Sequence, residues 1–307
     1  MKNNKYCLFT NDVETTSIWH NALKDEMGKK VYEIGMPMLL ELYNKYDIQT
    51  TFFFTGYIAK LYPQIVKMVA SQGHEVASHA MSHEKRDGFD ILTFNEQVKS
   101  LTESKKILED LSGSEVVSFR APALRVNHNT VLALEESGYK YDSSIASQRF
   151  DMLLSFGSLK KLNWLSAPRL PYRASKNSLF KKGKSEIIEI PLSAMIMPYI
   201  GTTMRILPWI SRIQRTILSF ESNFNGKPIV FDIHPNEFID ESNEKRENFK
   251  RVSNKFISLF QDTLRSNLKT SNLGIKGYHL YEEQLNYFYK REFKFRKLKD
   301  YASSLTV

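Results

Sequence analysis

The 307-residue sequence predicts an α/β protein that forms a closed or nearly closed barrel rather than a small open sheet. Three observations lead to this fold class: short apolar runs alternate with helical patterns, seven such runs occur, and the chain can bury one large core. Alternation of strands and helices is typical of parallel βαβ units. Barrels of such units often reach this length as a single domain.

The candidate strands share apolar, β-branched or aromatic side chains, and they lie at residues 6–10, 51–55, 75–78, 116–119, 139–142, 187–191 and 229–233. The candidate helices between them lie near residues 33–46, 62–72, 94–111 and 127–137. The last of these ends at Ser137-Gly138, a plausible helix stop. We therefore expect one barrel domain over residues 1–285.

Residues 143–186 break this alternation, because Ser, Lys, Arg and Pro are mixed there with scattered aromatic residues. We expect a long insertion that covers the active face of the barrel. Residues 286–307 form a tail rich in basic and aromatic residues. The tail is either a closing helix or a contact with anionic lipid.

An apolar segment covers residues 195–220. Its second part places apolar residues at helical spacing, at Ile206, Trp209, Ile210, Ile213, Ile217 and Phe220. Such a stripe predicts a helix with one apolar face. The simpler expectation is that this face meets the core, and the alternative is that it docks on a membrane surface.

The formal net charge is +9, which indicates a solvated basic surface, an anionic substrate or a membrane surface. No motif of a nucleic-acid-binding protein occurs, so we expect no nucleic-acid partner. Cys7 is the single cysteine, so an intramolecular disulfide is excluded and a buried, inert thiol is expected. Because no apolar run resembles a signal peptide or a membrane span, we expect a cytoplasmic protein, with peripheral contact at the inner membrane face as an addition.

His79 and His83 follow the strand expected at residues 75–78, and they are spaced i and i+4. On one face of a helix, two such imidazoles can bind one metal ion. Two surface histidines are the alternative, but a position after a barrel strand favours a site. His74, at the other end of that strand, is too far from His79 to share a ligand, so we expect a structural role for it.

Asp12 and Glu14 stand at the end of the first strand, where residues i and i+2 point to the same side. Either residue alone is equally explained as a helix cap or a turn carboxylate. Together they supply a third metal ligand and a general base, with one coordination position left open for water.

Two more strand ends carry candidate catalytic groups. Arg120, followed by Ala121 and Pro122, can pair with a carboxylate and keep it ionised, although a structural ion pair is the alternative. His234 closes the strand at 229–233 and can protonate a leaving amine, although a lone histidine is often structural. Asp232 stands two residues earlier and could orient His234.

Together these blocks resemble the polysaccharide deacetylase (NodB-homology) family. The resemblance rests on Asp12-Val13-Glu14, on Gly73-His74-Glu75-Val76-Ala77-Ser78-His79-Ala80-Met81-Ser82-His83, on Arg120-Ala121-Pro122 and on the late strand-end His234. The run Thr51-Phe52-Phe53-Phe54-Thr55-Gly56 is similar to the second strand of that family.

This resemblance implies a distorted seven-stranded (β/α) barrel and a site for a divalent metal, most simply Zn²⁺. The residue roles that it implies are Asp12 as general base, Glu14, His79 and His83 as metal ligands, Arg120 as the tether of Asp12, and His234 as general acid. Asp142, Asp232 and Pro122 are candidate supporting residues. Val13 separates the two acids, and Ala123-Leu124 and Tyr141-Asp142-Ser143-Ser144 replace other family elements. The Asp-Val-Glu order, Arg120-Ala121-Pro122, Tyr141-Asp142-Ser143-Ser144 and the run His234-Pro235-Asn236-Glu237-Phe238-Ile239-Asp240 most resemble deacetylases of bacterial exopolysaccharide synthesis.

The predicted function is metal-dependent removal of an N-acyl group, acetyl in the simplest case, from an amino sugar in polysaccharide or glycolipid biosynthesis. A lipid-linked or nucleotide-linked sugar would suit the basic charge. Two alternatives stay open: a metal-independent amidohydrolase of the same fold, similar to the allantoinase branch, and a sugar-binding pseudoenzyme.

Overall fold

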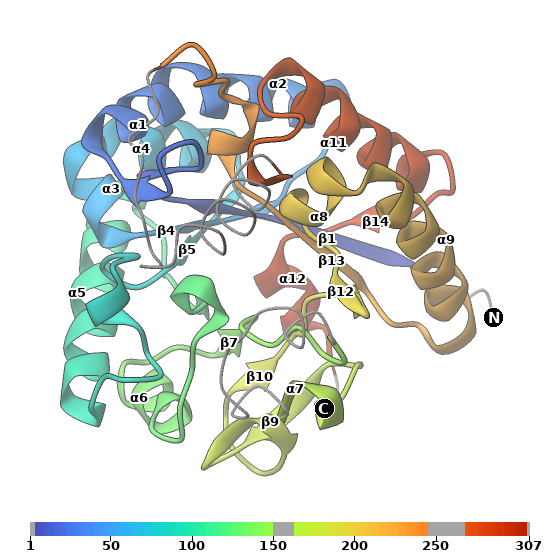
Figure 1. The fold of residues 1–307 in the computed structure, drawn as a ribbon. Coiled ribbons are helices and arrows are strands. Elements are labelled where there is room, and N and C mark those ends of the chain that lie inside the picture. Colours follow the sequence, from blue (N-terminus) through green and yellow to red (C-terminus); the bar gives the residue numbers. More distant parts are fainter. Residues whose placement is uncertain (1–3, 150–162, 245–267, 306–307) are drawn as a thin grey trace, which may run out of the picture.

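The computed structural model describes residues 4–149, 163–244 and 268–305. A curled β-sheet occupies its centre, and helices pack around the outside (Figure 1). The hydrogen-bonded path of the sheet passes through nine strands in the order β13-β1-β4-β5-β6-β7-β10-β8-β9, and β14 pairs with β1 beside this path. The α/β class is therefore confirmed, whereas the expected seven-stranded barrel is wrong in strand number and in closure, because the sheet is a half-barrel.

All seven expected strands are present, and neighbouring strands among them run parallel. They are β1 (Tyr6–Val13), β4 (Thr51–Phe54), β5 (Glu75–Ser78), β6 (Ser118–Phe119), β7 (Tyr141–Asp142), β10 (Ile188–Glu189) and β13 (Ile229–Ile233). The additional strands of this sheet are β8 (Tyr172–Ser175), β9 (Ser178–Lys182) and β14 (Lys294–Phe295).

The extra edge of the sheet comes from the expected insertion. β8 and β9 form an antiparallel hairpin, and β8 pairs with β10, so residues 172–182 extend the sheet. A short helix, α7 (Asn163–Ser166), precedes the hairpin. Residues 150–162 of the expected insertion lie outside the described residues. Two small hairpins stand apart from the main sheet: β2 (Thr16–Ser17) with β3 (Ala22–Leu23), and β11 (Ala194–Met195) with β12 (Met197–Pro198).

The four expected helices are observed as α2 (Met36–Lys45), α4 (Pro63–Ser71), α5 (Phe94–Ser112) and α6 (Thr130–Glu136). The start of α5 is set by a capping box between Thr93 and Glu96, and its end by Gly113 at φ +66°. The other helices are α1 (Asp25–Lys30), α3 (Gly56–Leu61), α8 (Gly201–Ile206), α9 (Pro208–Asn225), α11 (Ile275–Tyr289) and α12 (Leu298–Ser303).

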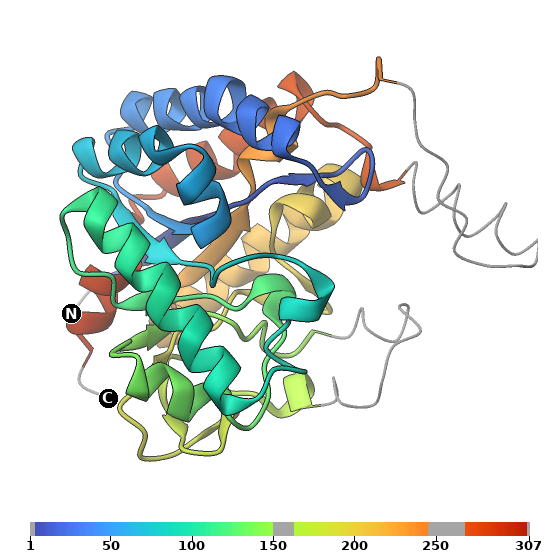
Figure 2. The same ribbon diagram turned by 90° about the vertical axis from the view of Figure 1, so that its left-hand side faces the viewer.

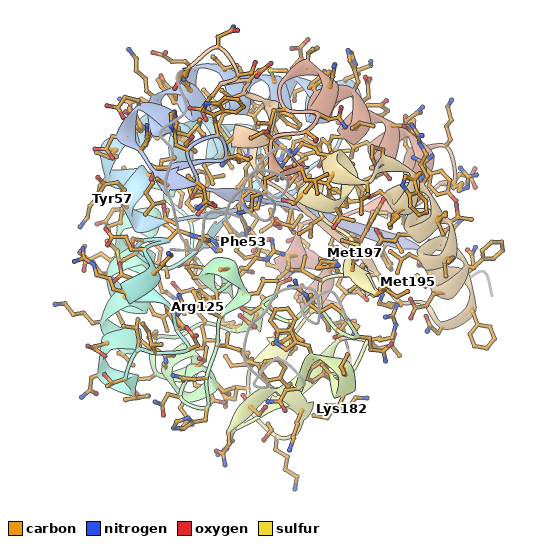
Figure 3. All side chains as sticks on the ribbon, in the orientation of Figure 1. Phe53, Tyr57, Arg125, Lys182, Met195 and Met197 are labelled. Atoms are coloured by element: carbon orange, nitrogen blue, oxygen red, sulfur yellow. The ribbon has the colours of Figure 1, made fainter. Side chains whose placement is uncertain are left out.

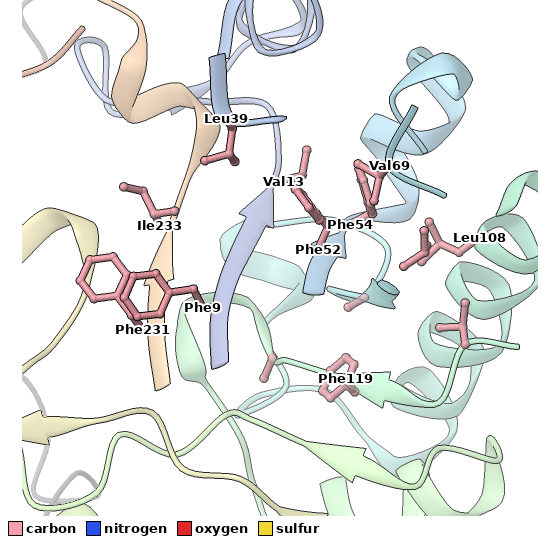
Figure 4. Packing of buried hydrophobic residues seen from close by; sticks show 14 of the residues in the cluster. Phe9, Val13, Leu39, Phe52, Phe54, Val69, Leu108, Phe119, Phe231 and Ile233 are labelled. Carbon is pink, nitrogen blue, oxygen red and sulfur yellow. The ribbon is translucent and has the colours of Figure 1, made fainter. Parts of the chain in front are cut away.

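The strands alternate between two buried faces, because successive side chains of a strand point to opposite sides. One set packs outward against the helices and includes Phe9, Phe52, Phe54 and Phe231 (Figure 4). A second cluster fills the inside of the curled sheet and includes Leu8, Phe53, Ala77, Ile188, Ile190, Leu192, Val230, Leu298 and Tyr301. Both faces are therefore apolar, as expected for a parallel sheet covered on both sides.

The C-terminal residues close one end of the half-barrel. In Figure 2, α12 lies at the left end of the molecule, beside both chain termini. Glu75 joins it to the sheet: its carboxylate accepts hydrogen bonds from the hydroxyls of Thr51 (2.7 Å) and Ser118 (2.6 Å) and from the backbone N–H of Lys299 (3.0 Å). The expected boundary at residues 285 and 286 falls inside α11, and the tail after it adds β14 and α12 to the fold.

The open side of the sheet lies between β13 and the hairpin of β8 and β9, and residues 193–200 partly bridge it. The N–H of Ser193 donates to the carbonyl of Val230 (3.0 Å), and Ile200 forms a parallel bridge with Asp232. Cys7 lies fully buried on β1, and burial raises the pKa of its thiol well above the usual value. The described helices include none that is long and apolar enough to cross a lipid bilayer.

Candidate active site

The site is built from the polar ends of strands whose lower parts form the inner apolar cluster. On β1 the inward set that begins with Leu8 continues through Thr10 and Asp12, and Glu14 follows just beyond the strand. On β13 the inward residue Val230 is followed by Asp232 and then by His234. The same two-residue alternation thus buries apolar groups at one end and gathers polar groups at the other.

Glu14, His79 and His83 converge. One potential ligand atom from each of the three lies within 4.8 Å of the others. The Glu14 Oε2 atom is 3.5 Å from His83 Nε2. Glu14 and His79 are buried, whereas His83 is partly exposed at the entrance. The structure therefore brings together the three residues that were predicted to bind a metal.

The backbone that carries His79 and His83 is not the helix that their spacing suggested. Residues 79–84 form an irregular segment after β5, and Ala80 adopts a left-handed backbone with φ +59°. The N–H of Ala80 donates to the Ser78 hydroxyl (3.2 Å), which stabilises this bend. The imidazole rings of His79 and His83 still lie with their centroids 5.7 Å apart. The helix expected over these residues is therefore wrong, because an irregular, bent segment takes its place.

His79 is held by a hydrogen bond between its Nδ1 atom and the carbonyl oxygen of Arg120 (2.7 Å). A carbonyl can only accept, so Nδ1 carries the proton and the lone pair of Nε2 faces the site. Burial lowers the pKa of His79, which favours the neutral imidazole that binds metals. His79 is therefore already oriented as a ligand.

Arg120 is fully buried at the base of the site. Its Nη1 atom donates to Asp12 Oδ1 (2.9 Å), Asp232 Oδ1 (2.7 Å) and the hydroxyl of Thr10 (2.8 Å). Its Nε and Nη2 atoms donate to the carbonyl (2.9 Å) and the hydroxyl (3.0 Å) of Ser143. The guanidinium also lies 4.3 Å from the centroid of the Phe53 ring. Arg120 thus holds Asp12 through a hydrogen bond and an ion pair.

The two aspartates that share Arg120 differ in their pKa. Burial alone would raise the pKa of Asp12, but the charges of Arg120, His79 and His234 lower it. For Asp232, burial and the neighbouring charge of Asp12 raise the pKa in spite of Arg120. Asp12 is thus the more acidic carboxyl of the two, and its Oδ2 atom lies 3.7 Å from His79 Nε2.

His234 lies across the site from the two other histidines, with its Nε2 atom 3.9 Å from Glu14 Oε1. Its Nδ1 atom is 3.3 Å from Glu237 Oε1, not hydrogen-bonded to Asp232. Burial lowers the pKa of His234, but the hydrogen bond to Glu237 and the charges of Asp232, Glu14 and Asp12 outweigh it and raise the pKa to about 10. His234 is therefore protonated in this arrangement.

The sequence prediction missed Glu237 and Arg205. Both side chains are buried, and Arg205 donates to Glu237 and to the carbonyls of Lys269 (2.9 Å) and Ser271 (2.8 Å). Glu237 follows His234 by three residues in a short 3₁₀ turn, and its carboxylate also accepts from the His234 N–H (3.3 Å). An acid three residues after a strand end is the pattern of a capping box, and that signal could have identified it.

Pro122 is buried at the start of a 3₁₀ turn that spans Pro122–Leu124. After it, Ala123 and Leu124 both adopt positive φ values, of 52° and 55°. This backbone directs the Ala123 N–H into the site, where it donates to His83 Nε2 (3.1 Å). The turn after Arg120 therefore delivers a backbone donor to the cluster of Glu14, His79 and His83.

Asp142 lies deeper and is hydrogen-bonded to Ser144 rather than to Glu14, His79 or His83. Its carboxylate accepts from the hydroxyl (2.7 Å) and the N–H (3.1 Å) of Ser144. The Ser144 hydroxyl in turn accepts from the N–H of Ala121 (2.9 Å). Asp142 thus reaches the site through the backbone between Arg120 and Pro122.

The donor set fits a divalent cation. Two imidazoles and one carboxylate are typical zinc ligands in hydrolytic sites. Both Glu14 Oε2 and His79 Nε2 are buried, and neither has a hydrogen-bond partner among the described residues. Unsatisfied buried polar atoms are costly, and coordination would satisfy both of them. By contrast, a second group, formed by His20, Glu241 and Glu244, already has a cation, because Lys30 pairs with both of its carboxylates.

Known proteins resemble this chain over part of its length. Residues 30–141 match the sequence model of the family described as polysaccharide deacetylase. A curated peptidoglycan deacetylase from Helicobacter pylori is 31% identical over 128 residues, which cover 41% of this chain and 43% of the relative. The chain thus spans less than half the length of this relative.

Two crystal structures show similar folds at low sequence identity. A Mycobacterium smegmatis protein, provisionally described as a polysaccharide deacetylase, has a TM-score of 0.55 at 21% identity, over 76% of this chain and 78% of that one. The Puue allantoinase has a TM-score of 0.60 at 17% identity, over 98% and 90%. These likenesses concern the fold alone. Over residues 30–141 and the aligned segments, the chain is therefore similar to polysaccharide deacetylases.

Proposed function

We propose that this protein is a metal-dependent hydrolase that removes an N-acyl group, most simply acetyl, from an amino sugar. The observation that carries the proposal is the convergence of Glu14, His79 and His83, beside an ionised Asp12 and a protonated His234. Amide hydrolysis needs a base for the attacking water and an acid for the leaving nitrogen, and these two residues provide both.

In this proposal Glu14, His79 and His83 hold the metal, and Zn²⁺ suits their donor set. A bound divalent cation supplies Lewis-acid polarisation of the acyl carbonyl and a lower pKa for water. A cation bound to Glu14 would lower the pKa of His234, because it would offset the Glu14 charge that helps to raise that pKa.

The residues of this chain then divide the proton transfers. Asp12, held by Arg120 through Oδ1, accepts the proton of the attacking water at Oδ2. The Ala123 N–H, which donates to His83 in the structure, is close enough to the cluster to stabilise a tetrahedral oxyanion. His234 donates its proton from Nε2 to the departing sugar nitrogen, while Glu237 holds Nδ1.

The finer substrate class is also part of the proposal. The net charge of +9 suits an anionic substrate, such as a lipid-linked or nucleotide-linked N-acetylamino sugar. Asp12-Val13-Glu14, Arg120-Ala121-Pro122 and Tyr141-Asp142-Ser143-Ser144 support the exopolysaccharide-associated branch and a role in polysaccharide or glycolipid biosynthesis. Acetate release from free, nucleotide-linked and lipid-linked substrates would rank these classes.

Metal analysis combined with acetate release tests the core of the proposal. We expect His79→Ala to lose bound metal, and Asp12→Asn and His234→Ala each to lower turnover by about 10²-fold or more. His279→Ala, which changes an exposed histidine on α11, is the control and should keep metal and activity.

The alternative functions give different results in the same assays. Full activity after chelation would indicate a metal-independent amidohydrolase. Glycan binding without acetate release would indicate a pseudoenzyme. Stoichiometric metal and full turnover in purified His79→Ala would contradict the ligand assignment.

A further inference from the structure

The helix α9 has the reverse of the polarity expected for a helix on a protein surface. Its buried residues are mostly polar and comprise Ser211, Gln214, Leu218, Ser219 and Ser222. Its exposed large apolar residues are Trp209, Ile213, Ile217, Phe220 and Phe224, and Arg212, which pairs with Glu283, is exposed beside them. A helix of a water-soluble domain normally buries its apolar face. The core-facing orientation expected from the sequence is therefore wrong for this stripe.

The most exposed residues of this stripe are aromatic. Trp209 is 60% exposed, Phe220 is 70% exposed and Phe224 is 89% exposed. Single exposed apolar residues are common on proteins, but a contiguous apolar stripe along one helix marks an interaction surface. We refer to Trp209, Ile213, Ile217, Phe220 and Phe224 as the α9 stripe.

A β-hairpin extends the apolar surface on one side of the α9 stripe. Met195 and Met197 of the β11–β12 hairpin lie beside α9 (Figure 3). A hollow of about 340 Å³ between the two is lined by Met195, Ile196 and Ile217, together with Gln148, Arg169 and Glu221. Ile196 at the hairpin tip is 68% exposed and has a φ of +60°, which is strained for a β-branched residue. The hairpin thus presents an isoleucine to solvent at an energetic cost.

A basic hollow borders the other side of the α9 stripe. It has a volume of about 430 Å³ and is lined by Lys5, Lys290, Arg291, Phe220, Tyr287, Thr216, Ser219, Asn223 and Glu292. Lys5 donates to the carbonyl of Arg291 (2.7 Å), and Arg291 stacks on the Tyr287 ring. None of Lys5, Lys290 and Arg291 forms an ion pair with an acid in the described part of the chain. Their charges are therefore available to an anionic partner.

We propose that the α9 stripe and the basic hollow beside it form a docking surface for an anionic lipid bilayer. Trp and Phe at a helix surface, flanked by Lys and Arg, are the combination that binds in the interfacial region of membranes. Lys5, Lys290 and Arg291 would contact lipid phosphates while Phe220 and Phe224 enter the acyl boundary. This inference concerns a surface outside the candidate active site and does not depend on the proposed hydrolase activity.

Charge favours a bilayer over a second copy of this chain as the occupant. A two-fold symmetric dimer through this surface would bring the same patch of both subunits together, and with it Lys5, Lys290 and Arg291 of each subunit. Like charges across an interface oppose association, whereas anionic headgroups are complementary to them.

Vesicle flotation of the full chain tests the docking surface. We expect binding to phosphatidylcholine vesicles that contain phosphatidylglycerol, weaker binding at high salt, and little binding to phosphatidylcholine alone. Phe220→Ser/Phe224→Ser should lower the partition coefficient by about tenfold or more. Lys290→Gln/Arg291→Gln should lower binding to the vesicles that contain phosphatidylglycerol by about tenfold or more, so that the preference over phosphatidylcholine alone is lost.

The matched control is Leu132→Ser, which removes an exposed apolar side chain from α6, on the other side of the molecule from α9 (Figure 1). It should bind vesicles as the unmodified chain does. Failure of the unmodified chain to bind phosphatidylglycerol vesicles at low salt would overturn the proposal, and so would unchanged binding by Phe220→Ser/Phe224→Ser. Sedimentation velocity without vesicles tests whether a second copy of the chain occupies the surface instead. If the unmodified chain is a dimer, Phe220→Ser/Phe224→Ser is a monomer and both bind vesicles equally, the surface belongs to a second copy.

Discussion

Arg120 organises the candidate site through the geometry of its guanidinium. The planar group donates to Thr10, Asp12 and Asp232 on one side and to Ser143 on the other. A lysine has a single charged atom and cannot reproduce this set of directions. Arg120 therefore fixes the orientation of Asp12 as well as its charge, and a buried cation with this many partners would be hard to replace.

Glu237 provides a residue-scale prediction about pH. Its hydrogen bond to the His234 imidazole helps to raise the pKa of that residue, so Glu237→Gln, which offers a neutral and weaker acceptor, should lower the pKa. If protonated His234 is the general acid, activity is lost as pH rises through its pKa, and the alkaline limb of kcat/KM should move to lower pH. The measurement is a pH profile of kcat/KM, corrected for the folded fraction of each variant.

Two further variants make this test specific for a positioning role. Glu237→Asp keeps the charge, so its alkaline limb should lie closer to that of the unmodified chain. Glu186→Gln removes an exposed carboxylate and should leave the profile unchanged. An alkaline limb that stays in place in Glu237→Gln would exclude the proposed coupling of Glu237 to His234.

Residues at strand ends were predictable from sequence, whereas their supporting partners were not. Asp12, Glu14 and His234 follow apolar runs, and the carboxyl ends of parallel strands meet at one edge. Arg205 comes from α8 and reaches Glu237 only through tertiary folding. The spacing of Asp232 and His234 suggested that the aspartate orients the histidine. In the structure Arg120 binds Asp232 instead, and this contact between distant parts of the chain cannot be read from spacing.

At the scale of elements, the long strands were easier to locate than the short ones. β5 and β13 have the same limits as expected; every residue of both strands is buried, although β5 also carries the polar residues Glu75 and Ser78. β6, β7 and β10 are each only two residues long, and side-chain pattern alone overestimates them. For α9, the helical period identified an apolar face, but it could not tell whether that face points to the core or to solvent.

The buried carboxylate of Glu75 connects β4, β6 and α12 through three hydrogen bonds, so its loss should weaken the attachment of α12 to the sheet. Glu75→Gln keeps the shape but replaces an acceptor oxygen by an NH₂ group that faces existing donors. We expect the free energy of unfolding to fall by about 1–3 kcal/mol. Urea unfolding measures the loss, and hydrogen exchange should show faster exchange at Leu298 and Lys299 of α12.

The control for this substitution is Glu115→Gln, which affects an exposed ion pair with Lys140. Surface pairs contribute little, so its unfolding curve should match that of the unmodified chain. Equal stability of Glu75→Gln and Glu115→Gln would show that Glu75 does not anchor the C-terminal helix.

At the scale of the whole molecule, the sequence predicted the α/β class of the fold but not the strands at the edge of its sheet. Seven apolar runs suggested closure, yet the structure adds β8 and β9 beside β10 and leaves the sheet open. The hairpin Tyr172–Lys182 contains Arg, Lys and Ser on its exposed side, so its composition resembled a loop. An edge hairpin is half exposed, and its apolar signal is correspondingly weak.

His74 gives a prediction for global stability. Its Nδ1 atom accepts from the Thr50 N–H (3.1 Å), and burial, with a smaller effect of Lys297, lowers its pKa to about 4. Because an unfolded histidine has a pKa near about 6.5, the unfolded state binds more protons between these values. Stability should therefore fall as pH drops through this range, by as much as about 3 kcal/mol.

A substitution separates this effect from the titration of carboxylates. In His74→Asn the amide oxygen can still accept from Thr50, but the side chain does not titrate. Urea unfolding at several pH values should show a slope smaller by about 1.4 kcal/mol per pH unit between about pH 6 and 5. Identical slopes for the two proteins would contradict the lowered pKa of His74.

The burial of Cys7 has a practical consequence for spectroscopy. Because this sole thiol is inaccessible and its pKa is raised, alkylating probes would leave it unmodified in the folded chain. Phe224→Cys would then introduce one labelling position at the outer end of α9, with no need to remove a native cysteine first. A nitroxide attached there would report, by power saturation with oxygen and a nickel chelate, how deeply that end of the helix enters a lipid phase.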